Sequence, residues 1–478
     1  MVCSLSRVFF LLFLLSNVYS FIQNNHIKHV DKKMYEKMYV NMNNLDKLKV
    51  EPITKFTGEI TLPGSKSLSN RVLLLSALSE GKTLVENLLD SADIRFMLEA
   101  LEQLNIPLEE TRNENKVIIT GNGGPINVND SKDKEELFLG NAGTAMRPLA
   151  GVLCAGNGNF ILDGVPRMRE RPIIDLIDGL KQLGVDVECS NTGCPPVLIN
   201  AKGIKGGTAS ISGQISSQFL SALLMTGPLA NGPINLEIKD ELMSAPYVHM
   251  TMNLIKKFGG KVESENDKIF KVYPGKYKSP GKIFIEGDAS SASYFLAGGA
   301  IMGGPVTVYG CGSDSVQGDA RFAKVLEKMG ATVKYTSNSI TISRDLNTPL
   351  KGIDEDCGDI PDVAMTLAIV GLFAQGKTII RNVYNWRVKE TERMVAMVTE
   401  LTKLGIKVEE GRDYLIVHGM SDLNQMNSNV EIETYDDHRV AMCFSLAACA
   451  GIPVTILDPN CTSKTFPDYF EKLKDFTN

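Results

Sequence analysis

The chain has 478 residues, of which 43% are hydrophobic and 22% are charged, a composition that is ordinary for a soluble globular protein. Its net charge of −6 favours neither nucleic acid nor an anionic membrane as a partner of the mature chain. Anions must therefore be recognised by local clusters of charge, within a chain long enough for roughly two to four domains.

The first 20 residues have the pattern of a secretory signal peptide. Arg7 precedes an apolar run over 8–15, and small residues follow near Ser20; the run is too short to span a membrane. Residues 21–48 are rich in Lys, Asn and Met, lack apolar periodicity and indicate a transit or linker segment. A signal peptide followed by a basic segment is typical of the two-part address of secondary plastids. The alternative is plain secretion with a linker.

An amphipathic helix-to-strand phrase recurs five times, at intervals of roughly 70–80 residues, wider than the common solenoid repeats. Most copies end the helix with a glycine and continue with alternating strand residues. The copies begin near Leu98, Leu176, Asn253, Val325 and Val398. A partial sixth copy is YFEKLKDF at the C-terminus. The pattern predicts an α/β protein of five or six repeats.

Two strand–turn–helix joints divide these repeats. GEITLPGSKSLSNR begins at Gly58 and GKIFIEGDASSASYF at Gly281, and both have a glycine turn between strand and helix. Such joints suit two lobes of three repeats each, with the chain crossing near Gly64 and near Asp288. We therefore predict a discontinuous first lobe (49–65 and 287–478) and a second lobe (66–286).

Charged and polar turns precede several apolar helices. Lys66 stands at a helix start, where free N–H groups and the helix dipole favour an anion. Gly143 would let a ligand approach the backbone, and PRMRERP (166–172) is a candidate carboxylate or phosphate clamp. The other such positions are Ser216, Ser217, Gln218, Ser244, Asp362, Asn385, Lys389, Arg393, Arg439 and Lys464. Singly, each also fits a capped turn; together they predict an anion cleft, because a buried cation needs a counter-ion.

The cysteines and histidines favour no disulfide framework and no metal site. Nine cysteines include no CxxC pair, and Cys154, Cys443 and Cys449 lie in apolar runs typical of a core. Five histidines show no metal-ligand spacing beyond the near-terminal pair His26 and His29. We expect free thiols and neither a structural nor a catalytic metal.

The segments GSKSLSNR, NAGTAMRP, PRMRERP, NWRVKETER, DDHR and CTSKTFPDYF resemble, in order and spacing, those of the EPSP synthase family of enolpyruvyl transferases. The resemblance extends from about Gly58 to the C-terminus. It implies a two-lobed inside-out α/β barrel (alpha-beta prism) with three βαβαββ repeats per lobe. It also implies transfer of the enolpyruvyl group of phosphoenolpyruvate to the 5-hydroxyl of shikimate 3-phosphate, without a cofactor, and we expect a monomer.

Carried over residue by residue, the resemblance assigns two overlapping sets. Shikimate 3-phosphate would be held by Lys66, Ser67, Arg71, Ser216, Ser217, Gln218, Ser244, Asp362, Asn385 and Lys389. Phosphoenolpyruvate would be held by Lys66, Gly143, Arg171, Gln218, Arg393, Arg439 and Lys464. Asp362 is the expected base and Glu390 the family's candidate proton donor. Since neighbouring cations favour ionised Glu390, Lys66 is a third catalytic candidate.

The chain differs from the family pattern at two positions, and two other functions compete with the one that the resemblance implies. Ala245 replaces a lysine common in bacterial members, and Glu392 replaces an aspartate. UDP-N-acetylglucosamine enolpyruvyl transferases usually have a cysteine in the arginine-rich loop and Lys-Asn in the first loop, unlike this chain. A catalytically inactive binding protein would have lost charged positions that are retained here. Gly143, Thr144 and Pro148 resemble glyphosate-sensitive members, with Gly143 leaving room for that inhibitor.

Overall fold

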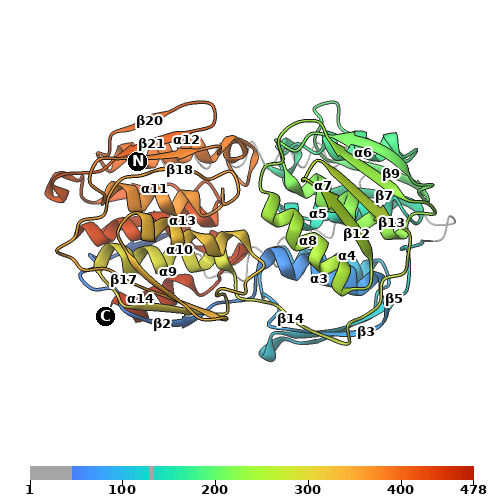
Figure 1. Cartoon of the computed structure of the whole chain (residues 1–478), viewed down its shortest axis with the longest axis horizontal. Coiled ribbons are helices and arrows are strands. Elements are labelled where there is room, and N and C mark those ends of the chain that lie inside the picture. Colours follow the sequence, from blue (N-terminus) through green and yellow to red (C-terminus); the bar gives the residue numbers. More distant parts are fainter. Residues whose placement is uncertain (1–45, 129–133, 478) are drawn as a thin grey trace, which may run out of the picture. The chain divides into compact units, whose positions relative to one another are not determined.

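The computed structural model describes residues 46–128 and 134–477, which belong to the unit Leu45–Asn478. The predicted signal peptide (1–20) and nearly all of the predicted transit segment (21–48) lie outside the described residues. Within those residues, no helix combines the length and the apolar character needed to cross a bilayer. Figure 1 shows a mixed architecture of helices and sheets, as predicted for an α/β protein.

The described strands form six sheets, five of them four-stranded. In each four-stranded sheet, a parallel pair is extended by an antiparallel hairpin. Three sheets lie in the predicted second lobe: β14(Lys282–Phe284)-β3(Glu80–Glu86)-β5(Lys116–Asn122)-β4(Leu108–Thr111), β6(Glu135–Phe138)-β7(Asn157–Asp163)-β9(Val197–Lys202)-β8(Asp186–Cys189) and β10(Gly207–Ile211)-β11(Ile234–Ile238)-β13(Ile269–Tyr273)-β12(Lys261–Glu265). Three lie in the first: β16(Thr332–Tyr335)-β17(Ser339–Ser343)-β15(Val306–Tyr309)-β2(Gly58–Thr61), β18(Asp354–Asp356)-β19(Lys377–Arg381)-β21(Leu415–His418)-β20(Val408–Glu410) and β1(Lys47–Val50)-β23(Val454–Leu457)-β22(Val430–Ile432).

The sixth sheet shows how the incomplete last repeat is completed. Strand β22 pairs parallel with β23, as in the other sheets, but β23 then pairs antiparallel with the N-terminal strand β1. The last helix, α14 (Tyr469–Thr477), buries Phe476 against Phe56 and Phe295, at centroid distances of 5.4 and 4.9 Å. Strand β1 thus occupies the position that a hairpin strand takes in the other five sheets.

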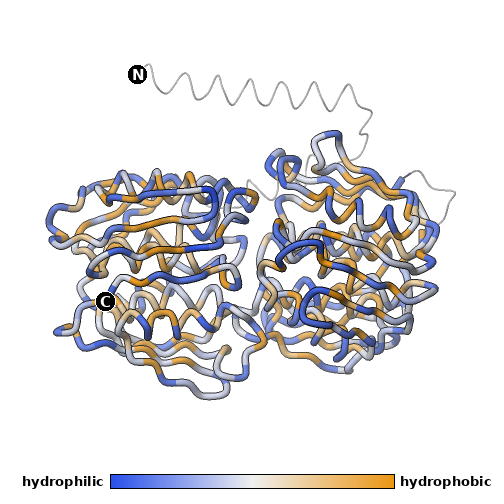
Figure 2. Tube along the Cα trace, turned by 45° about the horizontal axis from the view of Figure 1, so that its top comes forward, coloured by the Kyte–Doolittle hydropathy of each residue, from blue (hydrophilic) through white to orange (hydrophobic). Residues whose placement is uncertain are grey.

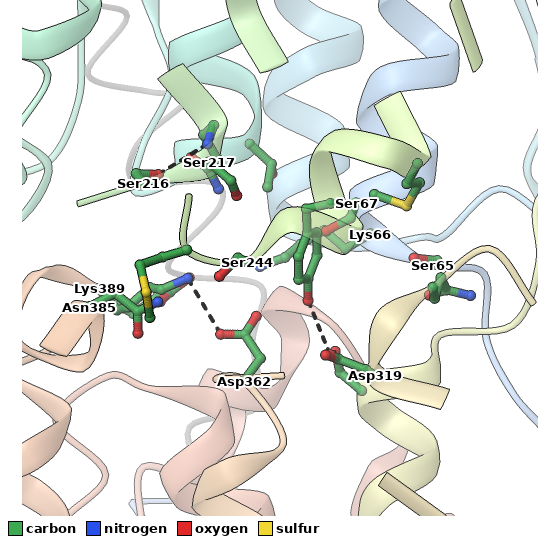
Figure 3. Close-up of a pocket in the computed structure, with 18 of the residues that line it drawn as sticks. Ser65, Lys66, Ser67, Ser216, Ser217, Ser244, Asp319, Asp362, Asn385 and Lys389 are labelled. Carbon is green, nitrogen blue, oxygen red and sulfur yellow. Dashed lines mark hydrogen bonds and ion pairs between the residues drawn. The ribbon is translucent and has the colours of Figure 1, made fainter. Parts of the chain in front are cut away.

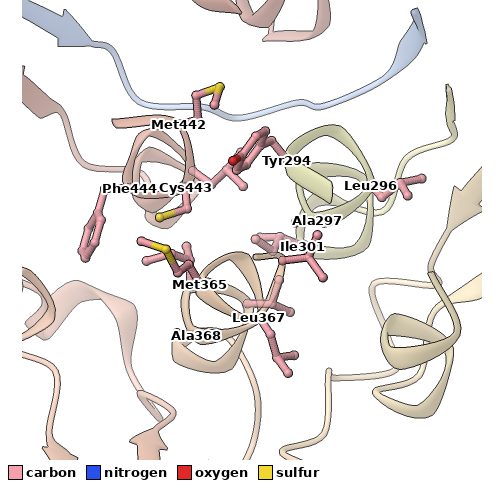
Figure 4. Packing of buried hydrophobic residues seen from close by; sticks show 14 of the residues in the cluster. Tyr294, Leu296, Ala297, Ile301, Met365, Leu367, Ala368, Met442, Cys443 and Phe444 are labelled. Carbon is pink, nitrogen blue, oxygen red and sulfur yellow. The ribbon is translucent and has the colours of Figure 1, made fainter. Parts of the chain in front are cut away.

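Six of the described helices form the interior. They are α3 (Lys66–Leu78), α5 (Gly143–Leu153), α7 (Ser217–Thr226), α9 (Ala289–Met302), α11 (Ala364–Leu372) and α13 (His438–Ser445), and nearly every residue in them is buried. A helix that is apolar on all sides belongs in a core. Figure 4 shows α9, α11 and α13 packed on one another through residues such as Tyr294, Met365 and Cys443. With buried helices inside and half-exposed sheets outside, the inside-out arrangement is confirmed.

The recurring phrase corresponds to a second set of helices. These are α4 (Ala92–Gln103), α6 (Ile174–Gln182), α8 (Ala245–Lys257), α10 (Phe322–Lys328) and α12 (Arg393–Lys403). The glycine after four of them has a positive φ, for example +81° at Gly184 and +83° at Gly405, and Asn105 has a φ of +62° in the first copy. Along the trace in Figure 2, hydrophobic and hydrophilic stretches alternate as amphipathic elements require.

The two crossings of the chain lie side by side. Gly64 and Gly287 form an antiparallel bridge, and Asp288 N donates to Pro63 O at 2.8 Å. A Cβ on Gly64 would lie 2.0 Å from the carbonyl oxygen of Asn87, so only glycine fits there. We keep the names first lobe (49–65 and 287–478) and second lobe (66–286); these boundaries stay a prediction.

Candidate active site

A pocket of about 860 Å³, part of it open to solvent, lies where all six buried helices begin. Each helix contributes a lining residue at or next to its first turn: Lys66, Thr144, Ser217, Ser290, Asp362 and Arg439. Figure 3 shows Ser216, Ser217 and Ser244 on one side of the pocket and Asp319 and Asp362 on the other. Because each helix N-terminus carries partial positive charge, their convergence favours an anionic ligand.

Most of the predicted site residues meet in this pocket. They are Lys66, Ser67, Arg71, Arg171, Ser216, Ser217, Gln218, Ser244, Asp362, Asn385, Lys389, Glu390 and Arg439. Gly143, Arg393 and Lys464 do not line it. Gly143 adjoins the lining residue Thr144, and Arg393 lies fully buried behind Asp362. Lys464, at the end of the turn Pro459–Lys464, donates from Nζ to Asp436 O at 2.6 Å.

The second-lobe wall presents hydroxyls and one well-held arginine. Ser216 caps α7 by accepting from Gln218 N at 3.2 Å. Arg71 is fixed because its Nε donates to Thr251 Oγ1 at 2.8 Å and its Nη1 to Ser67 O at 2.9 Å. Burial lowers the pKa of Arg71 to about 10, so the side chain remains a cation at neutral pH. This wall can bind a phosphate or carboxylate together with neutral hydroxyls.

Lys66 has a partner that the sequence did not reveal. Its Nζ lies 3.0 Å from Oδ2 of Asp93, and both side chains are less than one-tenth exposed. Asp93 lies in the first turn of α4, where an acidic residue is ordinary, so nothing in the local pattern singled it out. The contact holds the ammonium group in a fixed position at the start of α3.

The three arginines of PRMRERP have different roles. Arg169 pairs with Asp163, its Nε lying 2.9 Å from Oδ1, and Arg167 Nη2 donates to Lys389 O at 3.0 Å. Arg171 alone lines the pocket, with Nη1 donating to Asn141 O and Oδ1 at 2.8 and 2.9 Å. Only one of the three arginines of the loop can therefore reach a ligand in the pocket, fewer than the sequence indicated. Burial lowers the pKa of Arg171, which has no paired carboxylate among the described residues.

The first-lobe wall is a network of paired charges around Arg393. Its Nε lies 2.8 Å from Asp437, its Nη1 3.0 Å from Asp362 and its Nη2 2.8 Å from Glu390. Arg439 Nη2 also lies 2.9 Å from Asp362, and Lys389 Nζ lies 3.5 Å away. Asp437, which was not among the predicted site residues, also caps α13 by accepting from Arg439 N at 2.9 Å.

This network controls the ionisation of both predicted catalytic carboxylates. Burial acts to raise the pKa of Asp362, but Arg439, Lys389 and Arg393 outweigh it and hold that pKa well below its ordinary value. For Glu390, burial is outweighed by Arg393, Arg171 and Lys66, which likewise lower the pKa. Glu390 is thus a carboxylate at neutral pH, as its neighbours in the sequence indicated, and cannot donate a proton in that form.

Two further carboxylates, Asp288 and Asp319, line the pocket and were missed as site residues. Asp319 Oδ2 accepts from Tyr247 Oη at 3.0 Å and from Ser290 Oγ, which connects α8 to the turn Gly318–Arg321. Burial, then the charge of Asp362, raises the pKa of Asp319 to about 6. Its nearest partners lie far along the chain, so no local pattern could have identified it.

The thiols agree with the sequence prediction. All eight cysteines in 46–128 and 134–477 are free, and Cys154, Cys443 and Cys449 are buried. Over the same residues, no cluster of three or more His, Cys, Asp and Glu could hold a metal ion.

Comparison with known proteins agrees with this architecture. The family described as EPSP synthase (3-phosphoshikimate 1-carboxyvinyltransferase) matches residues 50–473. The chloroplastic 3-phosphoshikimate 1-carboxyvinyltransferase of Arabidopsis thaliana is 56% identical over 441 residues, 90% of this chain and 84% of that protein. The Vibrio atlanticus (strain LGP32) enzyme is 54% identical over 90% of this chain and 99% of its own length. The EPSP synthase structure from Acinetobacter baumannii superposes with a TM-score of 0.73 at 27% identity, covering 90% of this chain and 98% of that one. Sequence, fold and pocket thus agree that the chain belongs to the EPSP synthase family.

Proposed function

We propose that this pocket is the active site of a 3-phosphoshikimate 1-carboxyvinyltransferase. The chain transfers the enolpyruvyl group of phosphoenolpyruvate to the 5-hydroxyl of shikimate 3-phosphate and releases phosphate. The observation that carries the proposal is the convergence of six helix N-termini and several buried cations on one pocket that also offers serine hydroxyls. Two small polyanions, one of them hydroxylated, match that lining.

Both walls contribute residues to each substrate position. The hydroxyls of Ser216, Ser217 and Ser244, with the cation of Lys389, suit the phosphate of shikimate 3-phosphate. Arg171 of the second-lobe wall and Arg439 of the first-lobe wall suit the carboxylate and phosphate of phosphoenolpyruvate. Charge-assisted hydrogen bonds contribute roughly 1.5–3 kcal/mol each, so four or five can give micromolar binding after the cost of association. Holding both anions side by side also removes much of the entropic barrier.

The reaction needs two proton transfers in its first step. The 5-oxygen bonds to C2 of phosphoenolpyruvate while its proton goes to a base, and C3 gains a proton to become a methyl group. The tetrahedral adduct then loses phosphate and one methyl proton, which restores the double bond. We assign the first base to Asp362, whose carboxylate lines the pocket opposite the serines.

The charge network makes Asp362 a base that depends on substrate. Its low pKa arises from Arg439, Lys389 and Arg393 against the opposing effect of burial. The carboxylate of phosphoenolpyruvate competes for the guanidinium group of Arg439, which lines the pocket. This weakens the interaction of Arg439 with Asp362 and makes Asp362 more basic. Because Glu390 is ionised, we assign the donation to C3 to the ammonium of Lys66, with Glu390 as its electrostatic partner in the pocket.

A phosphate-release assay tests the proposal. Purified protein is supplied with phosphoenolpyruvate and either shikimate 3-phosphate or UDP-N-acetylglucosamine, and we expect turnover only with the former. Asp362→Asn should lower kcat by about 10²–10⁴-fold, the range for loss of a general base. The matched control is Asp359→Asn, whose carboxylate is 46% exposed and pairs with Arg321. The proposal is refuted if the protein shows no turnover with either acceptor, or if the Asp362→Asn variant is as fast as the control. Circular dichroism checks that each variant is folded.

We further propose that residues 1–48 direct the protein to a plastid and that the mature protein is a monomer. The plant relatives are named as chloroplastic, whereas bacterial relatives are nearly as similar, so the support for the address comes from its own sequence. A reporter fused to residues 1–48 should accumulate in the plastid; export from the cell would favour the secretory alternative. Light scattering on the purified protein measures the mass of the particle.

A further inference from the structure

A smaller cavity of about 290 Å³, part of it open to solvent, adjoins the active pocket. We call it the side cavity; it is lined by Arg147, Arg171, Pro172, Ile215, Ser216, Gln218, Phe219, Val388 and Lys389. Arg147 and Phe219 line this cavity but not the active pocket, whereas Arg171 lines both. No aspartate or glutamate is among the lining residues, although three of them are cations.

Arg147 is the unusual member of this lining. It is 4% exposed, and among the described residues its Nε and Nη1 have no hydrogen-bond partner. Its Nη2 makes only a long hydrogen bond, 3.3 Å, to Pro172 O. Burial, then the charge of Arg171, lowers the pKa of Arg147 to about 9, which still leaves it a cation at neutral pH.

No carboxylate in residues 46–128 and 134–477 pairs directly with Arg147. Glu390 attracts it electrostatically, but the carboxylate of Glu390 is bound to Arg393, with Oε2 2.8 Å from Nη2. A buried charge without a paired partner is costly, whereas the same charge beside a bound anion is stabilising. Two unpaired guanidinium nitrogens in a cavity lined by no carboxylate therefore favour the binding of an anion.

Other donors in the side cavity point the same way. Helix α7 begins at Ser217, and Ser216 and Gln218 at its N-terminus line the cavity. Nε of Arg171 is also buried without a partner in the described part of the chain. Planar guanidinium groups next to a helix N-terminus match the oxygens of a tetrahedral oxyanion.

We propose that the side cavity is a second oxyanion site, in which Arg147 binds inorganic phosphate next to the phosphoenolpyruvate position. The inference rests on the proposed function, because that reaction releases phosphate within reach of Arg171. Since Arg147 lies outside the active pocket, phosphate in the side cavity and phosphoenolpyruvate in the active pocket can be bound at the same time.

Phosphate inhibition tests this directly. With shikimate 3-phosphate saturating, phosphate should inhibit the wild-type chain in a mixed pattern against phosphoenolpyruvate, because it binds both with and without that substrate. In Arg147→Gln the uncompetitive component should weaken by about tenfold or more, the effect of losing one charge-assisted bond, and leave competitive inhibition. Arg147→Lys keeps the charge and should retain part of the mixed pattern.

The matched control is Arg321→Gln, which removes an exposed arginine paired with Asp359. Purely competitive inhibition of the wild type, or an unchanged mixed pattern in Arg147→Gln, would overturn the second site. If the wild type shows no turnover, the proposed function fails instead, and thermal melts decide the site separately. Phosphate should then raise the Tm of the wild type more than that of Arg147→Gln; equal shifts would refute it.

Discussion

The buried arginines in and beside the active pocket have opposite environments in the two lobes. In the second lobe, Arg147 and Arg171 bind only carbonyl and amide oxygens, and burial lowers the pKa of both. In the first lobe, burial acts in the same direction on Arg393 and Arg439, but ionised partners, Asp437 and Asp362 foremost, outweigh it and raise the pKa of each. Unpaired cations are available to a ligand, whereas paired cations hold catalytic carboxylates ionised and in place.

The largest effect on stability is expected when the same substitution, arginine to methionine, is made at a paired and at an unpaired arginine. Arg393→Met leaves the fully buried carboxylate of Asp437 without its arginine partner. The free energy of unfolding should therefore fall by about 3–5 kcal/mol. Arg147→Met removes a cation that has no paired carboxylate among the described residues, so the free energy of unfolding should fall by less than about 1 kcal/mol or should rise. Urea unfolding in phosphate-free buffer measures both. Equal destabilisation by the two variants would contradict the distinction between the lobes.

Asp319 tests the same idea with a negative charge. The charged and polar groups that face it are Tyr247, Asp288, Ser290, Asp362 and Arg439. Because its pKa in the folded protein, about 6, exceeds the ordinary 3.8, folded protein holds this proton more tightly than unfolded protein does. Its contribution to stability is therefore present below about pH 4 and is lost as pH rises through 6.

Asp319→Asn should accordingly gain stability relative to wild type as pH rises from 4 to 6, by up to about 3 kcal/mol at 1.36 kcal/mol per pKa unit. The amide can still accept from Tyr247, so the hydrogen bond is retained. Chemical unfolding at several pH values measures the difference between the two proteins. A difference that stays constant with pH would show that Asp319 titrates normally.

Gly143→Ala should disturb the unpaired arginines specifically. The added Cβ would lie 2.1 Å from Nη1 of Arg147 and 2.7 Å from Nη2 of Arg171, so both guanidinium groups must move. We expect the KM for phosphoenolpyruvate and the inhibition constant of glyphosate, measured against it, to rise by about 10–100-fold, or 1.4–2.8 kcal/mol. Adding Arg147→Lys to Gly143→Ala should lower the KM for phosphoenolpyruvate part of the way back, because the lysine side chain is thinner and makes room for the added Cβ. Unchanged constants in Gly143→Ala would exclude this role of the glycine.

The smallest effect is expected where a pair is exposed. Arg381 and Asp354 form two hydrogen bonds, at 2.6 and 2.7 Å, but both side chains are about half exposed. Arg381→Gln should leave thermal and urea unfolding nearly unchanged, because solvent screens an exposed ion pair. A loss as large as that of Arg393→Met would mean that pairing alone, and not burial, governs the energetics of the network.

The sequence predicted the parts of the site that depend on local structure. Lys66, Ser216 and Arg439 precede or begin apolar helices, so their positions at helix N-termini followed from capping and hydrophobic pattern. The repeat phrase likewise predicted helices α4, α6, α8, α10 and α12, because hydrophobic periodicity and a helix-ending glycine are local signals within one or two turns. Asp93, Arg147 and Asp319 carry no such signal, because what distinguishes them is a partner, or the lack of one, elsewhere in the chain.

The sequence by itself therefore determined the elements: six apolar helices, the turns before them and the repeated units that bring those turns to one place. Only the tertiary structure decided which charges are paired. Arg393 meets Asp437 across 44 residues and Arg439 meets Asp362 across 77. Arg147 meets no carboxylate in the part of the chain that the structure describes. The physical reason is range. Helix propensity and capping act between near neighbours, but the ionisation and affinity of a buried charge depend on distances of a few ångströms between segments that only folding brings together.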